Sequence, residues 1–140
     1  MDPIAHTLVG ASLAQTGLKR LSTFGTLTLL LAANAPDIDA FTMFLGRDVS
    51  LGARRGWTHG VLAMAVLPVA LAGLVWLLGR IRAPRDGAQA PSFTPLLVLS
   101  GVGVLTHPLL DWLNTYGIRL LMPFDDRWFY GDALFIVDPW

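Results

Sequence analysis

The chain has 140 residues, of which 54% are apolar and only 14% are charged, and its formal net charge is zero. An average soluble domain is roughly 25% charged, so this composition indicates a single membrane-embedded domain. The absence of cysteine excludes disulfides and thiolate ligands, and the lack of a basic face argues against nucleic acid as a partner. All ten acidic residues are aspartates, which suit metal ligation, although drift in a GC-rich genome explains this bias equally well.

Two apolar segments open the chain, at about 3–17 and 21–36, and we expect them to form a helical hairpin that turns at 17–22. Each has about fifteen residues and is short for a full span, which needs ~20. The segment 41–51 is expected to be an interfacial segment or a loop. The first segment contains small residues that favour tight helix packing: Gly10, Ala11, Ser12 and Ala14.

The strongest candidate spans are 61–79 and 93–113, joined by a polar linker at 80–92. The first has nineteen residues without a charge, close to the ~20 that cross a bilayer. In the second, Pro108 is expected to kink the helix or to restart it. The second also contains two small residues that permit close helix contact, Gly101 and Gly103.

Beyond Gly117 the sequence becomes mixed, and 123–128 predicts an aromatic turn at the membrane interface. The chain stops at 138–140, directly after an apolar stretch, which favours a truncated sequence or the first half of a larger protein. We therefore expect an all-α, multi-pass transmembrane bundle of about four helices, forming one domain over 1–140 that is truncated at its C-terminus.

The polar residues of the apolar segments are predicted to meet at one membrane face. We place the turn at 19–20 and the linker at 80–85 on one side and let four segments alternate in direction. The other side then receives His6, Asp37, Asp39, His59, His107 and Asp111. Because the bases of the linker side adjoin the spans, the positive-inside rule favours that side as cytoplasmic. The site is then expected on the periplasmic or outer face of the inner membrane.

Ionisable groups in membrane-like sequence indicate a functional site. His107 and Asp111 are four residues apart and share a helix face, so a metal can take a nitrogen from one and an oxygen from the other. The alternative is a hydrogen-bonded polar pair that joins helices. Asp37 and Asp39 would project to one side of an extended strand, where a cation relieves their repulsion. The alternative is a turn in which Asp37 caps a helix, and His6 taken alone is more typical of a core histidine.

Thr58 is expected to be the N-cap of the long helix that follows, whose N-terminus favours an anion. Arg55 would strengthen this site as a planar donor for phosphate or carboxylate. The alternative for Arg54 and Arg55 is a role as positively charged anchors at the membrane interface. Asn114 follows the predicted carboxylate ligand by three residues and is expected to support it.

These motifs resemble, in order and over nearly the whole chain, the LexA-regulated, membrane-bound, predicted metal-dependent hydrolases of bacteria and archaea. The members we would compare are usually longer, and Gly60 stands where a serine is common. The matching stretches are Met1-Asp2-Pro3-Ile4-Ala5-His6-Thr7, Ala35-Pro36-Asp37-Ile38-Asp39, Arg55-Gly56-Trp57-Thr58-His59-Gly60, His107-Pro108-Leu109-Leu110-Asp111 with its continuation to Gly117, and Asp132 to Pro139.

The resemblance implies a multi-pass inner-membrane protein with a metal site, distantly similar to the His/Asp-rich cluster of zinc-dependent phospholipase C. It implies Asp39 as a second choice of ligand. The ligands that it implies are His6, Asp37, His59, His107 and Asp111.

Together, residues and resemblance predict a hydrolase in which a divalent metal, with zinc favoured, brings the pKa of bound water toward ~7. Asp39 would act as base or ligand and Arg55 would hold the anionic group of the substrate. Membrane lipids are the expected partners, with a phosphoester or lipid-linked compound as the substrate. The alternative is a non-enzymatic membrane protein, either a metal or proton transporter or an assembly factor. A transporter would place its polar groups near the middle of the membrane.

Overall fold

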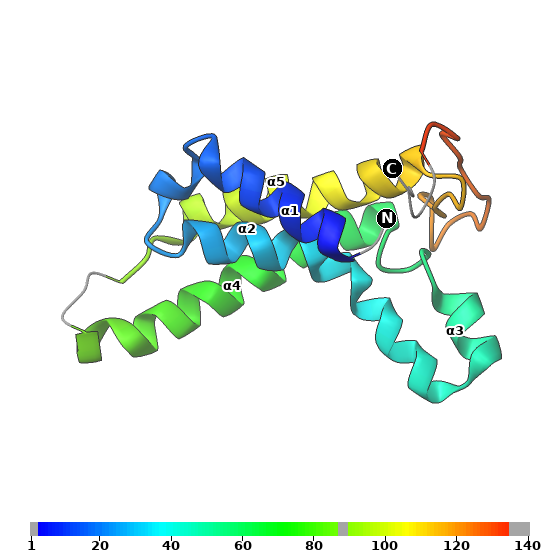
Figure 1. Cartoon of the computed structure of the whole chain (residues 1–140). Helices are drawn as coiled ribbons and strands as arrows, with labels where there is room; N and C mark the ends of the chain where they lie inside the picture. Colours follow the sequence, from blue (N-terminus) through cyan, green and yellow to red (C-terminus); the bar gives the residue numbers. More distant parts are fainter. Residues whose placement is uncertain (1–2, 87–89, 135–140) are drawn as a thin grey trace.

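The computed structural model describes residues 3–86 and 90–134, and this part of the chain is helical (Figure 1). Two isolated β-bridges are the only β-pairing within the described ranges. The α-helices are α1 (Pro3–Gln15), α2 (Gly25–Asn34), α3 (Arg47–Ala53), α4 (Val61–Asp86) and α5 (Phe93–Leu113), and the 3₁₀ helices are η1 (Leu18–Leu21) and η2 (Ala35–Leu45).

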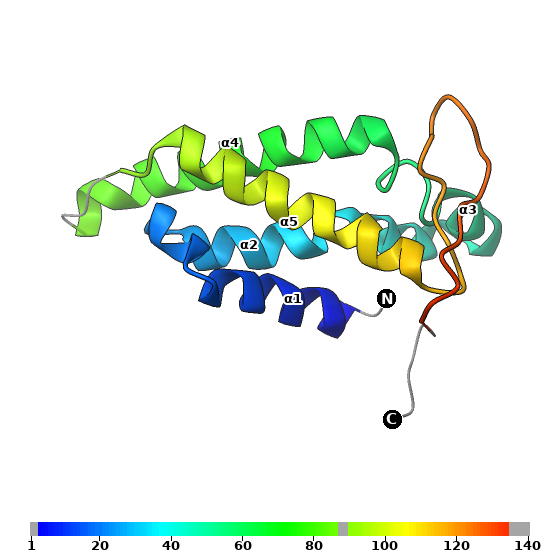
Figure 2. The same cartoon turned by 90° about the horizontal axis from the view of Figure 1, so that it is seen from above.

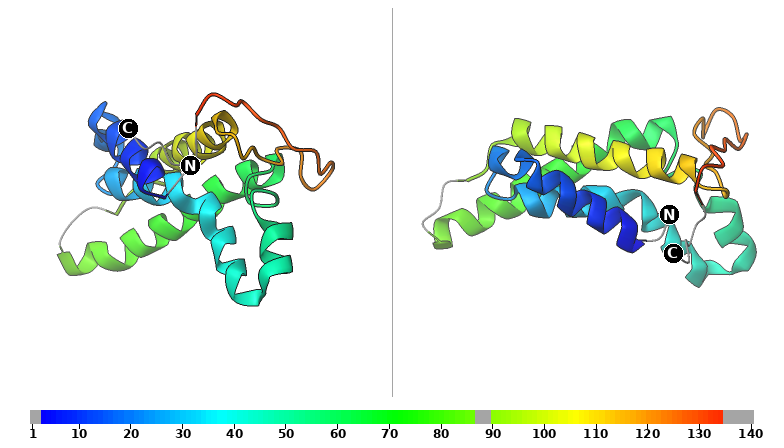
Figure 3. Two further views of the ribbon diagram at one scale, coloured as in Figure 1. Left: turned by 45° about the vertical axis from the view of Figure 1, so that its right-hand side comes forward. Right: turned by 45° about the horizontal axis from the view of Figure 1, so that its top comes forward.

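Four of the α-helices form a bundle in which α1, α2, α5 and α4 follow one another (Figure 2). The hairpin predicted at the start of the chain is formed by α1 and α2, which pack against each other. The other face of α2 packs against α5, and α5 in turn packs against α4. The helices η2 and α3 extend away from one end of this bundle as a separate hairpin (Figure 3).

Glycines permit the close approach of these helices. A Cβ atom added to Gly103 of α5 would lie 2.5 Å from the Cβ of Ala32 in α2. A Cβ atom on Gly10 of α1 would lie 2.9 Å from the carbonyl oxygen of Leu29. Gly101 has nothing within 4 Å of such an atom, so only one of the two small residues noted in α5 lies at the helix interface.

Several boundaries differ from those expected. The described ranges contain five α-helices where about four were expected, because residues 41–51 form the end of η2 and most of α3. The helix α4 continues to Asp86, through much of the predicted linker. The helix α5 runs through Pro108 without ending there.

Two helical stretches are long and apolar enough to cross a membrane, Val61–Arg82 and Phe93–Leu113. In the 18-residue window that qualifies each stretch, only 22% of the first and 39% of the second is buried inside the protein, which leaves apolar side chains that lipid can cover. The helices α1 and α2 have 13 and 10 residues, which is too short for a full span. The described residues therefore contain two candidate spans, and four spans are not confirmed.

Candidate metal centre

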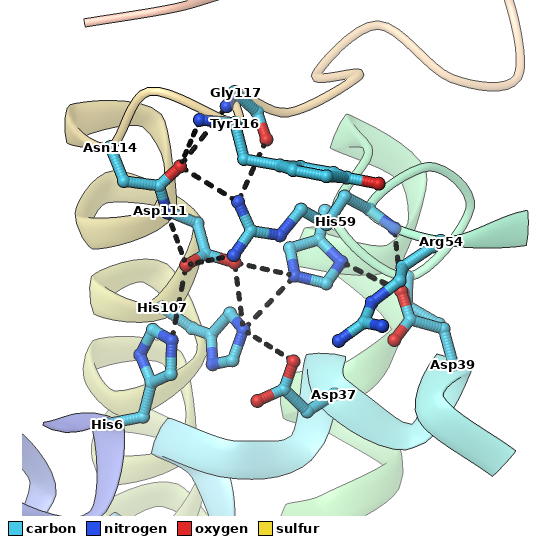
Figure 4. A network of polar contacts seen from close by, with 12 residues as sticks. His6, Asp37, Asp39, Arg54, His59, His107, Asp111, Asn114, Tyr116 and Gly117 are labelled. Atoms are coloured by element: carbon cyan, nitrogen blue, oxygen red, sulfur yellow. Dashed lines mark hydrogen bonds and ion pairs between the residues drawn. The ribbon is translucent and has the colours of Figure 1, made fainter. Parts of the chain in front are cut away.

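Buried polar side chains gather at one end of the bundle (Figure 4). They come from the start of α1, from η2, from the loop before α4, and from the end of α5 with the segment that follows it. Such a concentration of polar groups inside an apolar protein is costly unless each group is paired. The fully or almost fully buried members of the group are His6, Asp39, Arg55, His59, His107, Asp111 and Asn114.

Four residues direct one ligand atom each toward a common point: Asp37, His59, His107 and Asp111. These four atoms all lie within 4.8 Å of one another. The Nε2 atoms of His59 and His107 are 3.1 Å apart, and Oδ2 of Asp111 lies 3.3 Å and 3.6 Å from them. Oδ1 of Asp37 is 3.5 Å from Nε2 of His107. Atoms bound at about 2.0 Å to a tetrahedral zinc ion stand roughly 3.3 Å apart, so these separations match a metal-ligand set.

Hydrogen bonds on the far side of each imidazole set its tautomer. Nδ1 of His107 lies 2.6 Å from the carbonyl oxygen of Ala33, to which it donates. Nδ1 of His59 lies 3.0 Å from the hydroxyl oxygen of Thr58 and 3.5 Å from Oδ2 of Asp39. With both Nδ1 atoms protonated, the two Nε2 atoms present lone pairs to each other. A cation between them removes this repulsion.

The burial of His59 disfavours a proton as that cation. Burial lowers the pKa of His59 to about 2, so its imidazole is neutral at physiological pH. A neutral imidazole is the form that binds a divalent metal. In addition, Oδ2 of Asp37 is buried and has no hydrogen-bond partner among the described residues. Two imidazoles and two carboxylates are a donor set suited to a divalent ion such as zinc.

Asp39 lies behind His59 and outside the set of four convergent residues. Its Oδ2 accepts hydrogen bonds from the backbone N–H of Arg55 at 2.8 Å and from the hydroxyl of Thr58 at 3.1 Å. Burial raises the pKa of Asp39. A carboxylate in this place orients a metal-binding histidine and raises its basicity.

Two local expectations for this region were wrong. Asp37 and Asp39 lie in a 3₁₀ helix rather than in an extended strand, because Pro36 stands in the first turn of η2, where proline is well tolerated. Thr58 is not the N-cap of α4, which begins at Val61. The Thr58 hydroxyl instead donates to Asp39, across the loop.

His6 lies against the four convergent residues rather than among them. Its ring stacks on that of His107 with 3.6 Å between the centroids. Its Nε2 is 3.3 Å from Oδ1 of Asp111, although neither ring nitrogen has a hydrogen bond of acceptable geometry. His6 is thus close to the site, while its role as a ligand stays a prediction.

The guanidinium of Arg55 points into the protein interior, where it is bound by other residues of the chain. Its Nη1 donates to Oδ1 of Asn114 at 3.0 Å and to the carbonyl of Gly117 at 3.2 Å, and its Nη2 donates to Oδ1 of Asp111 at 3.2 Å. The same guanidinium lies over the ring of Tyr116, 4.7 Å from its centroid. These contacts hold the carboxylate of Asp111 in place.

The sequence had suggested Asn114 as a support for Asp111, and the structure shows this contact: Nδ2 of Asn114 is 3.3 Å from Oδ1 of Asp111. The part played by Tyr116 and Gly117 was missed. Oδ1 of Asn114 also accepts the backbone N–H groups of these two residues, which folds the segment after α5 over Arg55. The side chain of an Asn commonly accepts the backbone N–H two residues further on, as in an Asx turn, and this is the signal that could have found the contact.

These features define a helical membrane protein with a buried His/Asp cluster at one end of its bundle. The chain belongs to the YdjM inner membrane protein family, whose model matches residues 1–140. The family and the two apolar helices together indicate a location in the inner membrane.

One curated relative is the uncharacterized protein YfhP of Bacillus subtilis (strain 168). It is 24% identical over 110 residues, which make up 79% of this chain and 31% of that protein. The chain therefore spans about a third of the length of this relative. No solved structure matches the chain.

Proposed function

We propose that the protein is a metal-dependent hydrolase that acts at the surface of the inner membrane. The observation that carries this proposal is the convergence of two imidazole nitrogens and two carboxylates within 4.8 Å, with the two Nε2 atoms 3.1 Å apart. Asp37, His59, His107 and Asp111 would hold a divalent ion, and zinc suits this donor set best. Such an ion, when bound, lowers the pKa of its water toward ~7 and polarises a phosphoryl or acyl group.

Neighbouring residues have supporting roles in this proposal. Asp39 orients His59 from behind, and Arg55 fixes Asp111 and offsets its charge. Arg54 is exposed, and its side chain lies beside Asp39, where it is free to receive an anionic group (Figure 4). His6 is an additional candidate ligand through its Nε2. The substrate class that fits is a phosphoester or a lipid-linked compound.

The position of the site favours hydrolysis over transport. His59 lies just before the start of α4, and His107 and Asp111 lie in the last two turns of α5. A transporter would place its ion-binding groups near the middle of the spans. Among the described residues the cluster lies instead at one end of both candidate spans.

The proposal is tested by measuring the metal content of the purified protein by mass spectrometry. We expect one divalent ion per chain in the wild type and in the control variant Asp126→Ala, which alters an exposed carboxylate. We expect its loss in His107→Ala. Hydrolysis of p-nitrophenyl phosphate, and of phosphatidylglycerol in vesicles, should be lost with the metal. An equal, negligible metal content in all three proteins would eliminate the proposal.

A further inference from the structure

An apolar groove of about 530 Å³ adjoins the candidate metal centre. It is bounded by α2, η2 and α4, and it receives Pro3 from the start of α1. The polar side chains in its wall are those of Asn34 and Asp37. The large apolar side chains in its wall are Leu31, Ile38, Phe41, Leu67, Leu71 and Leu74.

Asp37 connects this groove to the metal centre. It lines the groove and also places its Oδ1 3.5 Å from Nε2 of His107. A ligand in the groove can therefore contact one of the four convergent residues directly. A second apolar hollow, of about 400 Å³ between α4, α5 and the segment after α5, is lined by none of the four convergent residues.

The two polar side chains of the groove wall come from one place in the fold, and the α4 part of the wall is entirely apolar. Asn34 and Asp37 lie at the end of α2 and the start of η2, beside the metal centre. From Leu67 to Leu74 the groove follows α4 for ~10 Å, at a rise of about 1.5 Å per residue. This part of α4 belongs to a candidate span, Val61–Arg82, so a membrane crossed by this stretch would surround the α4 wall of the groove with hydrocarbon.

We propose that the groove binds one hydrocarbon chain of a lipid phosphoester, with the phosphoester group at the Asp37 end. This inference rests on the proposed function and specifies its substrate class. An amphiphile with one polar end and one extended tail matches the polarity of the groove along its length. A packed helix, about 10 Å wide, would cover Asp37 and close the approach to the metal centre.

Ala70 and Ala65 offer a matched pair of variants to test this proposal. Both are exposed alanines of α4, but Ala70 lines the groove and Ala65 does not. Ala70→Trp fills the groove without removing a buried side chain, whereas Ala65→Trp adds the same indole to the neighbouring helix surface. Phe41→Ala provides a second groove variant, because it removes an exposed ring from the wall.

The experiment measures the binding of hexadecyl phosphate to the full chain in detergent by native mass spectrometry. We expect one bound molecule per chain in the wild type and in Ala65→Trp. We expect the bound fraction to fall on the order of tenfold in Ala70→Trp and to fall also in Phe41→Ala, because apolar contacts with the tail are lost. Circular dichroism and gel filtration establish that each variant is folded.

Equal binding in the two tryptophan variants, or equal loss in both, would overturn the proposal, because lipid would then coat α4 without using the groove. A dimer that Ala70→Trp dissociates, with no change in lipid binding, would also overturn it, because a second copy would then occupy the groove. The His107→Ala variant separates this inference from the proposed function. Loss of metal with hexadecyl phosphate retained supports the groove, whether or not the protein hydrolyses a substrate.

Discussion

Oδ2 of Asp39 lies 3.5 Å from Nδ1 of His59, and the same oxygen accepts the backbone N–H of Arg55 at 2.8 Å. One carboxylate of η2 thus holds both a candidate metal ligand and the turn that carries it. The direction in which Nε2 of His59 points therefore depends on a residue that is not itself among the convergent donors.

Replacement of this carboxylate should weaken metal binding without removing a ligand. For Asp39→Asn we expect zinc affinity to fall about 10–100-fold, since the amide is a weaker acceptor for the imidazole and lacks the negative charge. Zinc titration of the metal-free protein measures this change. Asp48→Asn, which alters an exposed aspartate of α3, should leave the affinity unchanged. Equal affinities in the two variants would remove the positioning role of Asp39.

Arg55 and Arg54 are neighbours in the chain with opposite environments. Arg55 is buried and bound to the Asp111 carboxylate, whereas Arg54 is exposed. Arg55→Gln leaves a buried carboxylate without its cation and should lower the free energy of unfolding by about 3 kcal/mol. Arg54→Gln should change it by less than about 0.5 kcal/mol. Thermal unfolding of the metal-free proteins in detergent measures both, and comparable stabilities would contradict the role of Arg55.

The glycines of α5 provide a test of helix packing. Gly103→Ala brings a methyl group against Ala32 of α2 and should cost about 1–3 kcal/mol of stability, as overpacking does. Gly101→Ala enters open space and should be neutral or stabilising by up to about 1 kcal/mol, because alanine favours the helix. Unfolding midpoints of the two variants distinguish the outcomes. If Gly103→Ala were as stable as Gly101→Ala, the close contact between α5 and α2 would be wrong.

Zinc should stabilise the folded protein through the same four residues. A ligand that binds only the native state at about 100 times its dissociation constant adds roughly 2.7 kcal/mol. We therefore expect zinc to raise the unfolding temperature of the wild type and a chelator to reverse the shift. His107→Ala should show neither effect, since it lacks one of the two Nε2 donors. A zinc-dependent shift of equal size in this variant would place the ion elsewhere.

The gathering of polar residues at one end of the bundle follows from the sequence pattern. Apolar segments of similar length that alternate in direction bring their ends to two faces only. His59 lies just before the start of α4, and His107 lies near the end of α5. The antiparallel packing of these two helices brings the two histidines together. The spacing of the segments therefore predicted that these polar residues meet at one end of the bundle, although α1 and α2 are shorter than a full span.

The contacts within the site depend on local geometry that no periodicity shows. Arg55 has a positive φ of 52°, and this turn, together with the loop after α5, directs its guanidinium to Asp111 and Asn114. The sequence suggested a substrate anion for Arg55 because its planar guanidinium would add to the free N–H groups expected at the start of the next helix, with an interfacial anchor as the alternative. Similarly, Thr58 has the residue type of an N-cap, but its hydroxyl is bound to Asp39 in the folded protein.

The order of the ligands along the chain has a consequence for biogenesis. Asp37 and His59 precede α4, whereas His107 lies 48 residues after His59, in α5. When only the first half of the chain has left the ribosome, two of the four donor residues have been delivered to the membrane. An ion held by the four proposed ligands could therefore be bound only after α5 has been inserted and has packed against the start of α4.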